Sequence, residues 1–267
     1  MISNINHVKS VLGELKAKKK FGQNFLIDSN IVEKIAKNAC DENDLTIEIG
    51  PGLGALTEML LKYSKAVDAY EIDRDMYEIL NNTISDDRLN IYLEDFLDTD
   101  LSRYNNEAIR VCSNLPYYVT TPILFKLFES DLNIKKITVM VQREVADRFK
   151  AKIGSEDYNA LSIIVQYLYD VKFEMAVPKS VFYPSPNVDS AVISFTPKVV
   201  RNKEYENKLF ELIKNCFKMR RKTLHNNLKQ FLDEDTITKI YETLKLSQTI
   251  RAQELSLDDY INISKII

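Results

Sequence analysis

Residues 45–54 read LTIEIGPGLG and contain the pattern that is most informative about the fold. Its first half, Leu45–Ile49, is a short run of mainly apolar and partly β-branched residues, which predicts a buried strand. Three glycines follow, Gly50, Gly52 and Gly54, and a helical pattern begins immediately after them. Glycines at a strand-to-helix turn let the backbone approach a ligand closely, and the start of the helix offers unpaired N–H groups. We therefore expect a ligand site at this turn.

Strands and helices continue to alternate after the glycine turn. The residues that follow it, Ala55–Lys62, are predicted to form a helix. The predicted strands are Leu45–Ile49, Ala66–Ile72, Leu89–Leu93, Ile109–Ser113 and Lys136–Gln142. Strands separated by helices favour βαβ units, which build a parallel sheet covered by helices on both faces. The predicted fold class is therefore α/β and Rossmann-like.

The last third of the chain has a different pattern. Tyr169–Val177 and Val188–Thr196 alternate between polar and apolar residues, which is typical of antiparallel strands at a sheet edge. After Pro197 the apolar spacing becomes helical, and the predicted helices include Thr223–Leu232, Asp235–Leu244 and a last one from Ser256. We therefore predict two domains: residues 1–197, an α/β domain with a basic N-terminal arm, and residues 198–267, a small all-α domain.

Charge is unevenly distributed along the 267 residues. The formal net charge of -3 argues against a protein that coats nucleic acid generally, because such proteins are basic as a whole. Between Lys198 and Lys229, however, ten residues are basic and three are acidic. A second basic cluster contains Lys16 and Lys18–Lys20. These two stretches are candidate surfaces for contact with a polyanion.

Cysteine content and hydropathy restrict the cellular setting. The three cysteines are far apart and form no CxxC pair, so neither a disulfide framework nor a zinc site is expected. No apolar run is long enough to span a bilayer, and no secretory signal begins the chain. We expect a cytoplasmic protein with no metal and no membrane contact.

Two acids follow the second and third predicted strands. Glu71 lies about 20 residues past Gly50, where a carboxylate can accept both hydroxyls of a ribose. Asp95 ends the third strand, where the amino group of an adenine would lie. The glycine spacing differs from the fingerprint for a dinucleotide pyrophosphate, which disfavours NAD. The simpler alternative is that the glycines only make a turn and that Glu71 is a solvated charge.

The fourth predicted strand ends in Asn114-Leu115-Pro116-Tyr117, the most specific motif in the chain. An exocyclic amine conjugated to a purine is a poor nucleophile, so it needs acceptors that hold its hydrogens out of the ring plane. The Asn114 side-chain oxygen and the Leu115 carbonyl can supply them, while Tyr117 offers a face for an extruded base. A sulfonium methyl donor needs no strong base, because positioning supplies most of the acceleration. Otherwise, Asn114 caps a turn and Tyr117 packs in the core.

These motifs together resemble the KsgA (RsmA) family of ribosomal RNA adenine dimethyltransferases, which is related to the Erm methyltransferases. The resemblance covers nearly the whole chain. The matching segments are Phe21–Leu26, Glu48–Gly54, Asn114–Tyr117 with Thr120–Pro122, Val141–Glu144, Phe182–Ala191, Arg220–Leu224 and Arg251–Ser256.

The resemblance implies a class I fold that uses S-adenosylmethionine as co-substrate. Two adjacent adenosines in the 3′-terminal hairpin of 16S rRNA would each become N6,N6-dimethyladenosine, during biogenesis of the 30S subunit. The implied site residues are Asn24, Leu26 and Gly50 at the methionine end of the donor, Glu71 at its ribose, Asp95 at its adenine, Asn114 between donor and acceptor, and Phe182, which would stack on the target base opposite Tyr117.

The same resemblance points to residues that would contact RNA. Arg220, Arg221 and Lys222 are expected to touch rRNA, and so are Lys18, Lys19 and Lys20. His225 stands where the family usually has an arginine, so a phosphate contact there is expected to be weaker or to depend on pH. We expect a monomer whose partner is 16S rRNA within the immature 30S subunit.

Three alternatives remain open at the level of sequence. An Erm-like methyltransferase would act on adenine in 23S rRNA, although the acidic net charge disfavours it because Erm proteins are typically basic. A ribosome-assembly checkpoint factor would act by occupancy rather than by chemistry. A DNA adenine methyltransferase is the third alternative.

Overall fold

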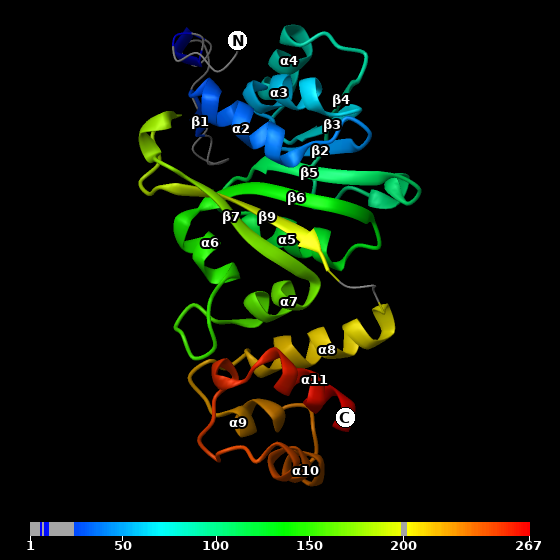
Figure 1. Cartoon of the computed structure of the whole chain (residues 1–267), viewed down its shortest axis with the longest axis vertical. Helices are drawn as coiled ribbons and strands as arrows, with labels where there is room; N and C mark the ends of the chain where they lie inside the picture. The colour runs from blue at the N-terminus through cyan, green and yellow to red at the C-terminus, as the bar shows by residue number, and fades with distance from the viewer. Residues whose placement is uncertain (1–5, 7, 11–23, 199–201) are drawn as a thin grey trace. The chain divides into compact units, whose positions relative to one another are not determined.

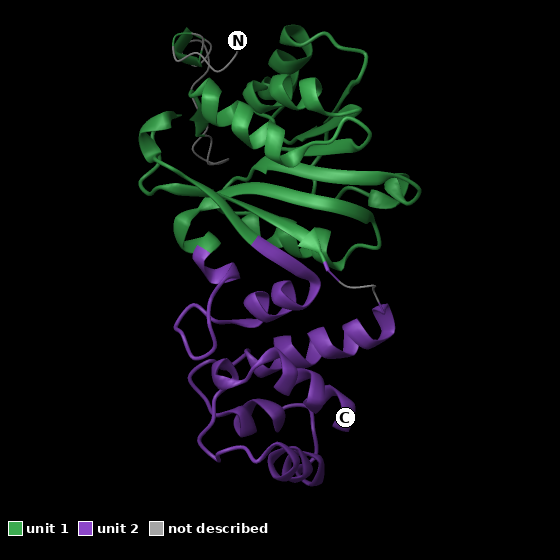
Figure 2. Cartoon of the chain, in the orientation of Figure 1, with its two compact units in different colours: residues 1–146, 172–197 green, residues 147–171, 198–267 purple. Residues whose placement is uncertain are grey.

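The computed structural model of the chain describes residues 6, 8–10, 24–198 and 202–267 (Figure 1). The chain divides into two compact units (Figure 2). Unit 1 contains residues 1–146 and 172–197, and unit 2 contains residues 147–171 and 198–267.

Unit 1 is built on a seven-stranded mixed sheet with the strand order β4-β3-β2-β5-β6-β9-β7. The first five strands in this order run parallel, and β9 runs antiparallel to β6. The strands are β2 (Leu45–Ile49), β3 (Ala66–Glu71), β4 (Leu89–Leu93), β5 (Ala108–Asn114), β6 (Asn133–Gln142), β7 (Tyr169–Val177) and β9 (Ser190–Pro197). The predicted parallel sheet is confirmed, and so is the antiparallel direction of β9.

Helices cover both faces of this sheet. On one face, α2 and α3 share a core with Cys112, Met140 and Val192 of three strands. Val192 and Phe195 are three residues apart on β9, so their side chains point to opposite faces of the sheet. On the face of Phe195, the ring of Phe128 from α5 packs edge to face against it. The helices of this region are α2 (Ser29–Ala39), α3 (Ala55–Tyr63), α4 (Arg74–Thr83), α5 (Thr120–Glu129) and α6 (Arg143–Phe149), with the 3-10 turns η2 (Leu101–Tyr104) and η3 (Lys179–Val181).

A separate two-stranded sheet joins distant parts of unit 1. Its strands are β1 (Phe25–Leu26) and β8 (Phe182–Tyr183), which pair antiparallel. The pairing places Leu26 beside Phe182. The segment Phe182–Tyr183 is thereby held against the residues that precede α2.

In the residues of unit 2 that the structure describes, the regular elements are helices apart from the start of β7. Leu209, Ile213, Leu228, Ile240 and Ile263 are fully buried within it. Its helices are α7 (Ala160–Leu168), α8 (Lys203–Cys216), α9 (Leu224–Leu228), α10 (Glu234–Leu244) and α11 (Leu257–Ile266), with the 3-10 turn η4 (Ala252–Glu254).

The compact units differ from the predicted division in one segment. Residues 147–171 were expected within the α/β domain, whereas they cluster with the C-terminal helices. The cause is α7, which packs against α8 and α11. The chain passes from unit 1 to unit 2 again after Pro197.

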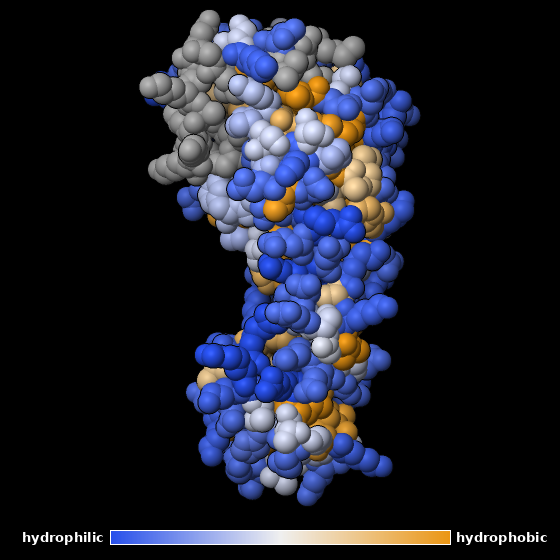
Figure 3. All heavy atoms as spheres, turned by 90° about the vertical axis from the view of Figure 1, so that its left-hand side faces the viewer, coloured by the Kyte–Doolittle hydropathy of each residue, from blue (hydrophilic) through white to orange (hydrophobic). Residues whose placement is uncertain are grey.

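No helix within the described ranges is both long and apolar enough to cross a membrane. The face of the molecule drawn in Figure 3 is largely hydrophilic, with hydrophobic side chains in small separate groups.

Candidate functional site

The glycine turn adopts the left-handed backbone conformation that glycine favours. Gly50 has φ +69° and Gly52 has φ +57°. A Cβ atom on Gly52 would lie 3.1 Å from Cε1 of Phe25, so a side chain there meets both backbone strain and a close neighbour. The N–H of Gly50 donates to the carbonyl of Tyr70 at 2.8 Å, which ties the turn to the end of β3.

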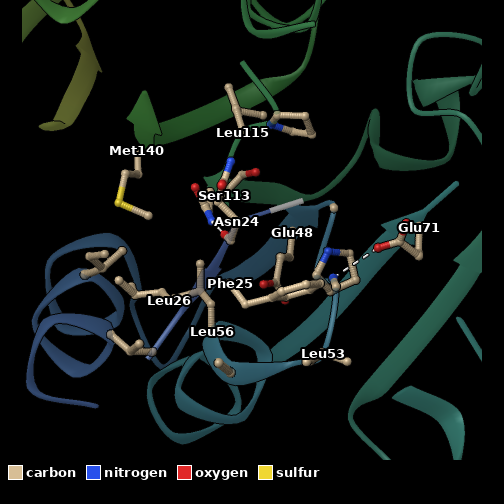
Figure 4. A pocket seen from close by; sticks show the side chains of 18 of the residues that line it. Asn24, Phe25, Leu26, Glu48, Leu53, Leu56, Glu71, Ser113, Leu115 and Met140 are labelled. Atoms are coloured by element: carbon tan, nitrogen blue, oxygen red, sulfur yellow. Dashed lines mark hydrogen bonds between the residues drawn. The ribbon is translucent and has the colours of Figure 1, made fainter. Parts of the chain in front are cut away.

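Glu71 binds the glycine turn directly. Its Oε2 accepts from the N–H of Gly52 at 3.0 Å (Figure 4). Its Oε1 accepts from the N–H of Asp73 at 2.8 Å. The side chain is buried, and burial raises the pKa of Glu71 above its usual value. Glu71, which is predicted to bind a ribose, therefore lies at the end of β3 and beside the glycine turn.

The turn and the neighbouring strand ends surround a cavity of about 110 Å³. The apolar residues Leu26 and Met140 lie on the side away from Glu71 (Figure 4). The predicted site residues that line the cavity are Asn24, Leu26, Gly50, Glu71, Asn114, Leu115 and Tyr117. Segments that are far apart in the sequence are thus brought together at the carboxyl edge of the sheet.

Asp95 lines a second, adjoining hollow of about 270 Å³. The two hollows share Gly50, Ile72, Pro116 and Tyr118 as lining residues. Together they form a two-lobed trough that fits an elongated ligand. One lobe lies at the glycine turn and the other lies at the acid that follows β4.

The side chain of Asn114, at the end of β5, is held by a hydrogen bond from its amide nitrogen. Its Nδ2 donates to the backbone carbonyl of Asn24 at 3.2 Å, so the amide oxygen is the atom left to accept from a ligand. The preceding residue, Ser113, donates from Oγ to the carbonyl of Ile49 and ties β5 to β2. Leu115 has a buried side chain, and its N–H donates to the carbonyl of Met140 at 3.2 Å.

Tyr117 is held by Ser190, a residue for which the sequence predicted no individual role. Its hydroxyl shares a hydrogen bond of 2.8 Å with Oγ of Ser190, a fully buried residue at the start of β9. Burial raises the pKa of Tyr117, so the phenol stays neutral. The bond fixes the position of the ring relative to Asn114.

Phe182 is not among the residues that line the cavity. Its side chain is 3% exposed and belongs to the core cluster that contains Leu26, Val32 and Val177. Its predicted role of stacking on a base stays a prediction, and it requires the ring to leave this core.

Glu48 lines the cavity and was not predicted as a site residue. Its side chain is 2% exposed, and its Oε2 accepts from Oγ1 of Thr57 at 2.6 Å. Burial, with a smaller contribution from Glu71, raises the pKa of Glu48 to about 8. The signal in the sequence is an acid on a strand that is otherwise apolar, two residues before the first glycine.

The predicted RNA-binding residues of unit 2 lie on the connection between α8 and α9. Arg220, Arg221 and Lys222 are all exposed. The buried Asn227 shapes this connection, because its Oδ1 accepts from the N–H of Met219 at 2.9 Å and its Nδ2 donates to the carbonyl of Met219.

Two further predictions concern the basic residues. Nε2 of His225, in α9, lies 3.1 Å from Oε1 of Glu234. A carboxylate therefore neighbours the residue that stands in place of the family's arginine. Lys18, Lys19 and Lys20 lie outside the described residues.

Within the described ranges, no group of three or more His, Cys, Asp or Glu side chains is arranged to hold a metal ion. Cys40, Cys112 and Cys216 are all free thiols.

The donor set of the trough fits S-adenosylmethionine. The buried carboxyl of Glu48 lines the cavity, and the acids Glu71 and Asp95 stand beside the two lobes. These acids and the glycine turn stand at the carboxyl edge of a mainly parallel sheet, as the fold requires for a bound nucleoside. Fold and site thus define a class I S-adenosylmethionine-dependent methyltransferase.

Comparison with known proteins identifies the family. Residues 14–267 match the family described as Ribosomal RNA adenine dimethylase, and the chain belongs to this family. A relative from Bacillus pumilus named Ribosomal RNA small subunit methyltransferase A is 45% identical over 269 residues, which cover 94% of this chain and 91% of the relative. A protein of the same name from Leuconostoc mesenteroides is 42% identical, with 98% of this chain and 94% of the relative covered.

Solved structures agree with the fold. A dimethyladenosine transferase from Plasmodium falciparum has a TM-score of 0.75 at 26% identity, covering 90% of this chain and 95% of that one. The 23S rRNA methyltransferase ErmE has a TM-score of 0.69 at 21% identity, with 91% of this chain and 99% of that one covered, and this similarity concerns the fold alone. The predicted fold class and the resemblance to the adenine dimethyltransferases are confirmed.

Proposed function

We propose that the protein dimethylates N6 of two adjacent adenosines in the 3′-terminal hairpin of 16S rRNA during biogenesis of the 30S subunit. The observation that carries this proposal is the position of Asn114 at the end of β5. Its amide nitrogen is bound to Asn24, it lines the same cavity as Glu71, and Tyr117 lies on the following turn. The names of the relatives support the choice of small-subunit rRNA.

The donor is assigned to the two-lobed trough. S-adenosylmethionine, when bound, supplies an electrophilic methyl group on a positively charged sulfur. We assign Asn24, Leu26 and Gly50 to its methionine end and Glu71 to its ribose. Asp95, which lines the second lobe, is assigned to its adenine.

The acceptor is assigned to the Asn114–Tyr117 turn. Oδ1 of Asn114 and the carbonyl of Leu115 accept the two hydrogens of the exocyclic amine, which turns its lone pair toward the donor. Tyr117 stacks on the extruded base, worth about 1–3 kcal/mol. Phe182 is proposed as the opposite stacking face only after its ring has left the core, so the first stacking contact falls to Tyr117.

Recognition of the ribosomal particle is assigned to basic residues outside the trough. Arg220, Arg221 and Lys222 form an exposed basic group of unit 2 that suits rRNA phosphates. Lys18–Lys20 are proposed as a second contact. In this proposal residues 1–197 perform the chemistry, residues 198–267 bind rRNA, and the protein acts as a monomer in the cytoplasm.

Labelled S-adenosylmethionine tests the proposal when it is offered with three substrates from a strain lacking this modification: immature small subunits, mature small subunits and large subunits. We expect label on small subunits, in adenosines of the 3′-terminal hairpin, and strongest incorporation on immature particles. Label confined to large subunits would support the Erm-like alternative instead. Tight binding to small subunits without transfer of label would favour the assembly-checkpoint alternative. An Asn114→Ala variant serves as the control that measures label not due to catalysis.

A further inference from the structure

Lys126 of α5 binds the loop that follows β4 through three backbone carbonyls. Its Nζ donates to the carbonyls of Phe96 and Leu97 at 2.8 Å each and to that of Thr99 at 2.6 Å. The ammonium also lies 5.5 Å from the centre of the Phe96 ring. An ammonium group has three N–H donors, so the head group of this half-buried side chain is fully used by one loop.

The loop is a tight turn built on Asp95. Oδ1 of Asp95 accepts from the N–H of Leu97 at 2.9 Å, and its carbonyl accepts from the N–H groups of Asp98 and Thr99 at 3.0 and 3.1 Å. The turn satisfies these donors internally, whereas the carbonyls of Phe96, Leu97 and Thr99 converge on Lys126. Backbone carbonyls away from water need such partners.

The ammonium group of Lys126 binds backbone carbonyls of the loop and not a carboxylate. Within the described residues no carboxylate forms an ion pair with it. Burial lowers the pKa of Lys126, while the nearby Asp98, Asp95 and Asp100 oppose that shift. Hydrogen bonds from a charged donor are roughly twice as strong as neutral ones, so three of them hold the loop firmly.

The clamp joins the two walls of the second hollow. One wall is the loop, with Asp95, Phe96 and Leu97, and the other is the start of α5, with Val119 and Ile123. Lys126 follows Ile123 by three residues, which is about one turn of the same helix. Its side chain therefore fixes how far the loop stands from α5.

We propose that Lys126 is a positioning residue that sets the width of the hollow around Asp95 and thereby the enzyme's selectivity for adenine in its methyl donor. The inference rests on the proposed assignment of Asp95 to the donor's adenine. Lys126 acts through the loop and does not line the hollow itself. A loop released from α5 shifts the carboxylate of Asp95 and the rings beside it, so the distinction between a 6-amino and a 6-oxo purine weakens.

A matched control exists in the same unit. Lys136 of β6 is also half-buried and donates to the backbone carbonyl and to Oδ1 of Asn38, at 2.7 and 2.9 Å. It ties β6 to the end of α2 and lines neither hollow. Lys136→Met thus removes a comparable clamp from elsewhere in the fold.

The test measures binding of S-adenosylhomocysteine and of its inosine counterpart to wild type, Lys126→Met, Lys126→Arg and Lys136→Met by calorimetry, with donor KM and kcat alongside. We expect Lys126→Met to lose about tenfold in affinity for S-adenosylhomocysteine, with a smaller loss for the inosine compound. Its donor KM should rise while kcat at saturating donor changes little. Lys136→Met should keep the selectivity of wild type. Lys126→Arg keeps the charge but carries a larger planar head group, so it should fold and still show reduced selectivity.

An Asp95→Asn variant separates the inference from the function on which it rests. Selectivity lost in Asp95→Asn but unchanged in Lys126→Met and Lys126→Arg overturns the role of Lys126 alone. Unchanged selectivity in all three variants overturns the assignment of Asp95 as well. An equal loss of selectivity in Lys136→Met would show a general structural effect and would also overturn the inference. If Lys126→Met does not fold, Lys126→Arg decides the same question.

Discussion

Single hydrogen bonds orient the groups of the acceptor site. The Tyr117 hydroxyl meets Ser190, and the Asn114 amide meets the backbone of Asn24. Neither bond touches a ligand, yet each fixes a group that would. The polar partner is buried or half-buried in both cases, so its loss leaves an unsatisfied group that costs about 1–3 kcal/mol.

Ser190→Ala is expected to lower turnover on the RNA substrate by about tenfold while donor affinity stays the same, because only the position of Tyr117 changes. Tyr117→Phe should behave alike, and the double variant should add little to either, as expected for two ends of one bond. Ser194→Ala is the control, since Ser194 is a buried serine of the same strand that donates to Glu174 at 2.6 Å. Additive losses in the double variant would contradict the pairing.

Glu48 makes the stability of the ligand-free protein depend on pH. Its pKa of about 8 in the folded state lies above the ordinary value of 4.5, so between these values the folded chain holds a proton that the unfolded chain has released. Raising the pH through this window therefore favours unfolding, by up to about 1.4 kcal/mol for each pH unit.

Glu48→Gln mimics the protonated carboxyl and should flatten that dependence. Urea unfolding of both proteins at several pH values between about 5 and 8 measures the difference. The two free energies of unfolding should diverge as pH rises, with the variant relatively more stable at the alkaline end. Parallel curves would contradict the raised pKa of Glu48.

At the scale of elements, the glycine turn is the part whose shape depends most on residue type. Gly52→Ala places a Cβ 3.1 Å from the Phe25 ring at a φ of +57°, so we expect lower affinity for S-adenosylhomocysteine and a loss of stability of about 1–2 kcal/mol. Gly154→Ala is the matched control, because Gly154 has φ +79° and no atom lies within 4 Å of the position that its Cβ would take. It should lose stability and keep donor affinity. Equal donor affinity in both variants would contradict the role of the turn.

The strands that could be predicted were those with clear local signals at both ends. β2 and β4 were predicted to the residue, because each is a short run rich in apolar, β-branched or aromatic residues that turn-forming or polar residues precede and follow. Helix α7 was missed, because Ala160–Leu168 is apolar on nearly every side and lacks the polar face that reveals a helical period. It begins at a capping box between Asn159 and Ser162, which was the available signal.

The site was only partly predictable, for a related reason. Residues at strand ends, such as Glu71 and Asn114, follow from the order of the strands. The bond between Tyr117 and Ser190 joins segments 73 residues apart, and no local pattern encodes it. The burial of Phe182 likewise depends on the pairing of β8 with β1, which lie far apart in the sequence.

At the scale of the whole molecule, an acidic chain must bind a polyanion through a few basic groups. Arg221→Ala with Lys222→Ala should weaken binding to small subunits and reduce the slope of log affinity against log salt by about 0.7–0.9 for each phosphate that the variant no longer binds. Lys239→Ala with Lys265→Ala removes the same charge from exposed positions of unit 2 and should leave the slope unchanged. Equal slopes for the two pairs would contradict the proposed surface.

The role of Asn114 in methyl transfer is tested by the single-turnover rate of Asn114→Ala on immature small subunits, with donor and RNA affinities measured in parallel. Loss of Oδ1 of Asn114, which accepts a hydrogen bond from the amine, should slow methyl transfer by about 10²–10³-fold. This is the range for removing one well-placed polar group from a reacting site. The affinities for donor and RNA should both stay within a few-fold of wild type. A variant that transfers methyl groups at the rate of wild type would show that Asn114 does not hold the amine for transfer.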